Sequence, residues 1–140
     1  MTLKELMQQV LDLDEAGRLK LAGSSLTTMY EELEKCGVTG DKAGSFVIAC
    51  IKTFVSADRS CSMEEYQFIK KLYNLDMSYD EFFDMTNHGA DDDYVTWFDE
   101  MIDSFTEDGK YAVCTFGLCI LTTDGTLTVE EQKLFARILA

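Results

Sequence analysis

A segment that occurs twice in the 140-residue chain constrains the fold more than any other feature. The first copy, FVSADRSCSMEEYQFIKKLY, starts at Phe54, and the second, ILTTDGTLTVEEQKLFARIL, starts 66 residues later at Ile120. The matched polar pairs are Asp58 with Asp124, Ser62 with Thr128, Glu64 with Glu130 and Glu65 with Glu131. Because repeated sequence units usually fold alike, the duplication predicts two copies of one supersecondary motif.

The motif is expected to be helical. Apolar residues recur at steps of three and four along most of the chain, and no stretch of strand length alternates apolar with polar residues. The chain has no proline, which fits short turns between helices. We predict an all-α protein of seven or eight helices that forms a single domain over residues 1–140. Two pseudo-symmetric helix–loop–helix repeats are expected near residues 41–73 and 107–140, with a helical extension over residues 1–40.

The charge of the chain limits its partners. The net charge is −14, and the segment 72–109 contains 12 acidic residues and no lysine or arginine. Nucleic-acid binding requires a basic surface, and anionic membranes repel an acidic one, so neither partner is expected. No apolar run is long enough for membrane insertion. The acidic segment is a solvated surface, a docking surface for a basic protein partner or a loose store of cations.

The cysteines and the histidine give no catalytic pattern. The five cysteines show neither a CxxC pair nor zinc spacing, and the N-terminal segment does not resemble a signal sequence, which predicts reduced thiols in a cytoplasmic protein. Cys61, in the first repeat loop, is expected to be the most exposed thiol. The only histidine, His88, has no nucleophile placed beside it by the sequence. We therefore expect a protein that is not an enzyme.

The repeat loops carry the candidate metal ligands. Asp58 precedes Glu65 by seven residues, and Asp124 precedes Glu131 by the same spacing. If the two units pack with both loops at one end, these four carboxylates converge, and like charges at that distance favour a bound cation. Oxygen ligands alone select a hard ion such as Ca²⁺, Mg²⁺ or Mn²⁺.

The same loop residues have two other interpretations. An EF-hand requires glycine at position 6 and glutamate at position 12, but counting from Asp124 places Val129 and Phe135 there, so the loops are not EF-hands. Helix capping alone can explain the same residues. Ser62 with Glu65, and Thr128 with Glu131, each have the spacing of a capping box, in which serine or threonine and glutamate cap one helix reciprocally. Both the metal site and the capping role remain open from the sequence.

The two loops also resemble a known family. The pattern Ala57-Asp58, Ser62 and Glu65, followed by Asp124-Gly125, Thr128 and Glu131, with an apolar helix after each, resembles the TerB-like domain, a family named for bacterial tellurite resistance. The resemblance covers about residues 41–140 and leaves the first 40 residues outside.

The resemblance implies an all-helical fold with pseudo-symmetric halves and a role in metal or envelope stress. It also implies divalent-metal binding through the acidic loop residues, which here are Asp58, Glu65, Asp124 and Glu131. One departure concerns the first loop, where Arg59 occupies the position of Gly125. A nearby cation weakens metal binding, so this departure puts the first loop in doubt as a metal site.

Overall fold

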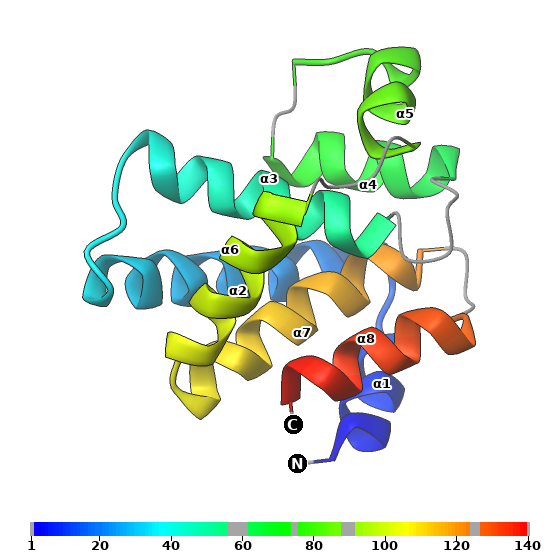
Figure 1. Cartoon of the computed structure of the whole chain (residues 1–140). Helices are drawn as coiled ribbons and strands as arrows, with labels where there is room; N and C mark the ends of the chain where they lie inside the picture. The colour runs from blue at the N-terminus through cyan, green and yellow to red at the C-terminus, as the bar shows by residue number, and fades with distance from the viewer. Residues whose placement is uncertain (1, 56–61, 74–75, 88–91, 124–126, 140) are drawn as a thin grey trace.

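The computed structural model describes residues 2–55, 62–73, 76–87, 92–123 and 127–139, and within these ranges it contains eight α-helices and no strand (Figure 1). The helices are α1 (Leu3–Leu11), α2 (Glu15–Lys35), α3 (Asp41–Val55), α4 (Met63–Tyr73), α5 (Tyr79–Asn87), α6 (Asp92–Ser104), α7 (Glu107–Leu121) and α8 (Val129–Leu139). The prediction of an all-α fold with seven or eight helices is confirmed. None of the described helices combines the length and the apolar content that crossing a bilayer requires.

The helix boundaries repeat at the same spacing as the sequence. Adding 66 to the first and last residues of α3 and α4 gives the first and last residues of α7 and α8. Two helices, α5 and α6, separate the two pairs. A two-fold relation between the pairs in space stays a prediction.

Local hydrogen bonds explain where the long helix α2 begins and ends. The side chain of Asp14 accepts a hydrogen bond from the N–H of Gly17 at 2.7 Å, which caps the N-terminus. At the other end, Gly37 has a φ of 77°, a left-handed conformation that glycine adopts without strain. This turn lets the N–H of Val38 donate to the carbonyl of Leu33 at 2.8 Å, as in a Schellman motif.

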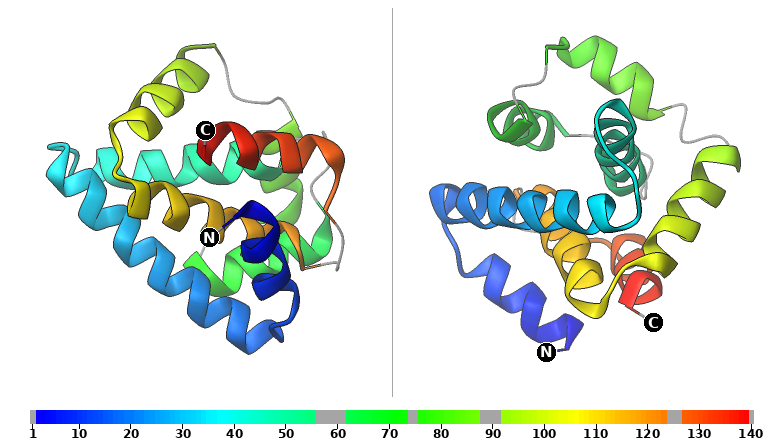
Figure 2. Two further views of the ribbon diagram at one scale, coloured as in Figure 1. Left: turned by 90° about the horizontal axis from the view of Figure 1, so that it is seen from below. Right: turned by 90° about the vertical axis from the view of Figure 1, so that its left-hand side faces the viewer.

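Helix α7 lies at the centre of the molecule (Figure 2). It packs most extensively against α2 and also contacts α1, α3, α4 and α8. All residues from Ala112 to Leu121 are buried, which explains why this helix has apolar residues on every side. Helices α5 and α6 contact α3 instead and lie at the periphery. The first repeat loop lies between α3 and α4, which both contact α7. The second lies between α7 itself and α8, which also contacts α7.

A glycine in α7 allows two aromatic rings to meet over the helix. The rings of Phe54, from α3, and Phe135, from α8, stack with their centroids 5.4 Å apart. A Cβ atom on Gly117 would lie 2.7 Å from the ring of Phe135 and 2.8 Å from that of Phe54. The absence of a side chain at this position therefore lets α3 and α8 approach the same face of α7.

Candidate functional site

The two glutamates predicted as metal ligands form helix caps. At the start of α4, the N–H of Ser62 donates to Oε1 of Glu65 at 3.0 Å, and the N–H of Glu65 donates to Oγ of Ser62 at 3.1 Å. At the start of α8, the N–H of Thr128 donates to Oε1 of Glu131 at 2.7 Å, and the N–H of Glu131 donates to Oγ1 of Thr128 at 3.2 Å. Both predicted capping boxes are confirmed.

Both capping glutamates are buried, although capping requires no burial. Glu65 is 6% exposed and Glu131 is 4% exposed. Helices α4 and α8 begin on the same side of the molecule, on the right in Figure 1, and both views in Figure 2 are consistent with this arrangement. Two equivalent carboxylates therefore lie in the first turns of two helices that start at a common end.

The other two predicted ligands, Asp58 and Asp124, lie outside the described residues, as do Arg59, Gly125, Cys61 and His88. Among the residues that are described, no three His, Cys, Asp or Glu side chains come close enough together to hold a metal ion. The four-carboxylate site therefore stays a prediction. Of its four residues, the structure describes only the two glutamates.

The acidic segment 72–109 is well exposed where its side chains are described. Helices α5 and α6, the turn before α5 and the first turn of α7 carry these groups. The exposed acidic residues are Asp76, Asp80, Glu81, Asp84, Glu100, Asp103, Glu107 and Asp108. Asp99 is half-buried and forms an ion pair with Arg137 of α8 at 3.4 Å.

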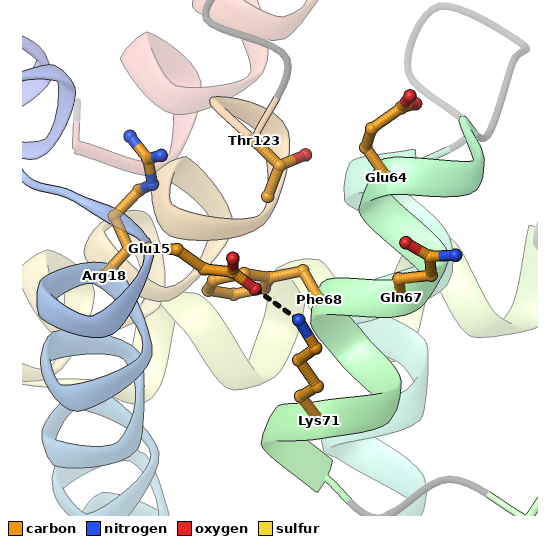
Figure 3. A pocket seen from close by; sticks show the side chains of 7 residues that line it. All are labelled: Glu15, Arg18, Glu64, Gln67, Phe68, Lys71 and Thr123. Atoms are coloured by element: carbon orange, nitrogen blue, oxygen red, sulfur yellow. Dashed lines mark hydrogen bonds and ion pairs between the residues drawn. The ribbon is translucent and has the colours of Figure 1, made fainter.

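A small cleft between α2 and α4 was not anticipated from the sequence (Figure 3). This α2–α4 cleft has a volume of about 160 Å³. Glu15 and Arg18 from α2 line one side, and Glu64, Gln67 and Lys71 from α4 line the other. The buried ring of Phe68 and the residue after α7, Thr123, complete the lining.

The α2–α4 cleft contains one ion pair and two buried polar atoms without partners. Nζ of Lys71 lies 2.7 Å from Oε1 of Glu15, so this pair spans the cleft. In the described part of the chain, Nε of Arg18 and Oγ1 of Thr123 are buried and have no hydrogen-bond partner. Buried donors without acceptors are uncommon in folded proteins and often indicate an unoccupied interaction.

A buried carboxylate between α2 and α7 was also not predicted from the sequence. Oε1 of Glu32 accepts hydrogen bonds from the N–H of Thr106, at 2.9 Å, and from its hydroxyl. The Thr106 hydroxyl, its N–H and the nearby Lys35 together lower the pKa of Glu32 below its usual value, although burial opposes them. Glu32 follows Met29 by three residues and lies on the buried stripe of α2. This position in the apolar pattern could have indicated from the sequence that its side chain is buried.

Comparisons with protein-family models, curated proteins and solved structures found no match to this chain. The described residues form an all-α protein with two capped helix pairs whose bounds repeat at an offset of 66. The TerB-like resemblance stays a prediction based on the loop motifs.

Proposed function

We propose that this protein is a non-enzymatic, TerB-like domain of the cytoplasm that binds a divalent cation where α4 and α8 begin, and that it acts in metal or envelope stress. The observation that carries the proposal is the repeated buried glutamate. Glu65 and Glu131 occupy equivalent positions, and both carboxylates are at least nine-tenths buried. Burying two charges at one end of a protein of net charge −14 is unfavourable unless a cation or hydrogen bonds compensate.

The chemistry of the loops favours a hard ion. Each buried glutamate follows a loop aspartate by seven residues, Asp58 before Glu65 and Asp124 before Glu131. Carboxylate oxygens without histidine or cysteine are ligands for Ca²⁺, Mg²⁺ or Mn²⁺. The cysteines at positions 36, 50, 114 and 119 are free thiols, which agrees with the reducing compartment in the proposal.

Glutamine substitutions separate ion binding from capping. Glutamine at N3 can still accept the hydrogen bond of a capping box, but it removes the charge that a cation needs. We expect one of the three ions to raise the melting temperature of chelator-treated protein at matched ionic strength. Stabilisation reaches about 2.7 kcal/mol when the free ion is at 100 times its dissociation constant. Glu131→Gln and Asp124→Asn should abolish this shift.

Glu130→Gln is the matched control, because Glu130 is the exposed neighbour of Glu131. It should leave the ion-induced shift intact. Equal melting temperatures with and without all three ions, once ionic strength is matched, would reject the metal proposal.

The second candidate function is protein interaction through the acidic surface of α5, α6 and the start of α7. The specific observation in its favour is that the capping hydrogen bonds give Glu65 and Glu131 a structural role. The acidic side chains of the segment 72–109 are meanwhile mostly exposed. A basic protein partner would be attracted by this surface, and its association would weaken with salt.

Charge-neutralised variants test the second candidate. Asp80→Asn, Asp84→Asn, Glu100→Gln and Asp103→Asn together should abolish salt-sensitive capture of a basic partner from cell extract. A control that neutralises the exposed Glu31 and Glu34 of α2 should retain capture. Equal capture by both proteins would contradict docking on this surface.

A further inference from the structure

A groove runs along the contact between α2 and α7, and we call it the α2–α7 groove. Two adjoining hollows form it, and both include Leu21, Tyr111 and Thr115 in their lining. Helices α2 and α7 lie side by side, and α1 packs against α7 and adds one residue to the apolar part of the lining (Figure 2). The side chains that offer carbon surface to the groove are Leu6, Leu21, Ser25, Thr28, Tyr111 and Thr115.

Three hydroxyl groups of the α2–α7 groove are hydrogen-bonded within their own helices. Ser25 donates at 3.0 Å, Thr28 at 3.3 Å and Thr115 at 2.7 Å, in each case to the carbonyl four residues earlier. Because these donors already have acceptors, an apolar side chain can cover them without leaving a buried donor unsatisfied. The groove can therefore bury the apolar face of a partner, although three of its lining residues are polar.

The charged side chains of the α2–α7 groove are all negative in its described lining. Glu107 and Asp108 line it from the first turn of α7, and both are exposed. The lining contains no lysine or arginine, unlike that of the α2–α4 cleft, which contains Arg18 and Lys71. The net charge of −14 also attracts basic partners from a distance. The groove is therefore complementary to a partner that is apolar on one face and basic beside it.

An amphipathic helix with basic residues has this combination of surfaces. Its apolar residues recur at steps of three and four and can enter a groove between helices, while flanking lysines or arginines reach the acids at its edge. Helix α1 contacts α7 in a similar way, with Leu6 and Val10 buried four residues apart. We propose that the α2–α7 groove binds a basic amphipathic helix of a partner protein. This proposal requires neither the metal site nor docking on α5 and α6.

A pair of synthetic peptides tests the proposal. The first, of about 18 residues, carries leucines at helical spacing and lysines at most other positions. The second has the same composition in scrambled order, so it keeps the charge and loses the apolar face. In fluorescence anisotropy titrations at about 0.15 M salt, the amphipathic peptide should bind at least about tenfold more tightly. Equal binding of the two peptides would overturn the proposal, because charge alone would then explain the attraction.

Arginine substitutions at adjacent positions locate the binding. Thr28 lines the α2–α7 groove, whereas Thr27 is exposed and does not belong to the lining. Thr28→Arg should weaken binding of the amphipathic peptide at least about tenfold, because a large cation then occupies the groove and repels lysine. Thr27→Arg adds the same charge and should have little effect. If Thr28→Arg does not fold, Ser24→Arg replaces it, because Ser24 is an exposed residue of the lining. Equal weakening at the lining and control positions would overturn the proposal.

Neutralising acids separates the α2–α7 groove from the acidic surface of α5 and α6. Glu107→Gln combined with Asp108→Asn should weaken peptide binding about three- to tenfold. Glu100→Gln combined with Asp103→Asn removes two exposed charges of α6 and should leave binding unchanged. The reverse pattern would place the peptide on α6 and overturn the proposal. Sedimentation that detects a dimer which Thr28→Arg dissociates would overturn it too, because a second copy would then occupy the groove.

Discussion

The ionisation of Glu32 should affect the stability of the fold. Hydrogen bonds from the Thr106 hydroxyl, then from its N–H, and the charge of Lys35 lower the pKa of Glu32 below its ordinary value of 4.5. A lowered folded-state pKa stabilises the protein above the unfolded value, and this stabilisation is lost as the pH falls through the folded value. We expect Glu32→Gln to lower the free energy of unfolding at neutral pH by about 1–3 kcal/mol.

Urea denaturation at several pH values checks this prediction. The difference between wild type and Glu32→Gln should shrink as the pH falls from neutral to about 3, because the wild-type carboxylate then becomes protonated. The control Glu31→Gln changes the exposed neighbour and should have little effect. A difference that stays constant with pH would show that the charge of Glu32 is not what stabilises the fold.

Two glycines should respond oppositely to the same substitution. A Cβ on Gly117 would overlap the rings of Phe54 and Phe135, and these packed rings cannot move without disturbing the core. Gly117→Ala should therefore lower the free energy of unfolding by about 1–3 kcal/mol. Gly23 lies in α2, and apart from its chain neighbours and the backbone of its own helix an added Cβ there would meet nothing within 4 Å. Gly23→Ala should raise the same quantity by roughly 0.5–1 kcal/mol, because alanine favours the helix.

Thermal and urea denaturation of both glycine variants provide the measurement. The structure predicts that Gly117→Ala lowers the free energy of unfolding and that Gly23→Ala raises it. Stabilisation by Gly117→Ala would mean that α3 and α8 do not approach α7 as closely as described.

Hydrogen bonds between residues close in the sequence could be predicted, whereas hydrogen bonds between residues far apart in the sequence could not. Glu65 is hydrogen-bonded to Ser62, and Glu131 to Thr128, each across three residues. The spacing in the sequence was therefore sufficient to predict both capping boxes. Glu32 instead bonds Thr106, 74 residues away. That contact depends on how α2 packs against α7, which no local pattern contains. Arg18 and Glu64 are brought to one cleft in the same non-local way.

At the scale of helices, the capping boxes should contribute directly to stability. Ser62→Ala and Thr128→Ala each remove a hydroxyl that accepts from the N–H of a glutamate at N3. Each should lower the free energy of unfolding by about 0.5–2 kcal/mol, as measured by urea denaturation.

Thr27→Ala provides the comparison for the caps. The Thr27 hydroxyl bonds the carbonyl of Gly23 within α2, and alanine is the better helix former at such an interior position. This variant should be neutral or more stable than the wild type. If Ser62→Ala and Thr128→Ala were equally neutral, the two hydroxyls would not cap α4 and α8 in solution.

Helix positions were predictable at this scale because their signals are local. In α2, the recurring apolar residues and the glycine after the helix, Gly37, are local signals of this kind. The repeat marked two further helix pairs, and their observed bounds keep the offset of 66. The sequence did not reveal that α2 and α7 form the most extensive helix contact. Both helices have buried faces, and apolar pattern alone does not say which faces meet.

At the scale of the whole molecule, α7 explains why most cysteines should be inert. Cys114 and Cys119 lie on this central helix and Cys50 on α3, and all three are fully buried. Burial raises the pKa of Cys114 and Cys119 to about 12, and it raises that of Cys50 well above its usual value. The thiolate is the reactive form, so these residues should react only when the protein opens.

Thiol labelling of the native protein measures this opening. In a Cys61→Ser background, a thiol reagent at neutral pH should modify exposed Cys36 rapidly, and mass spectrometry should find the three buried cysteines unlabelled. Their labelling should accelerate with urea in parallel with global unfolding, because α3 and α7 share one core. Rapid native labelling of Cys114 or Cys119 would mean that α7 is accessible to solvent and is not the centre around which the other helices pack.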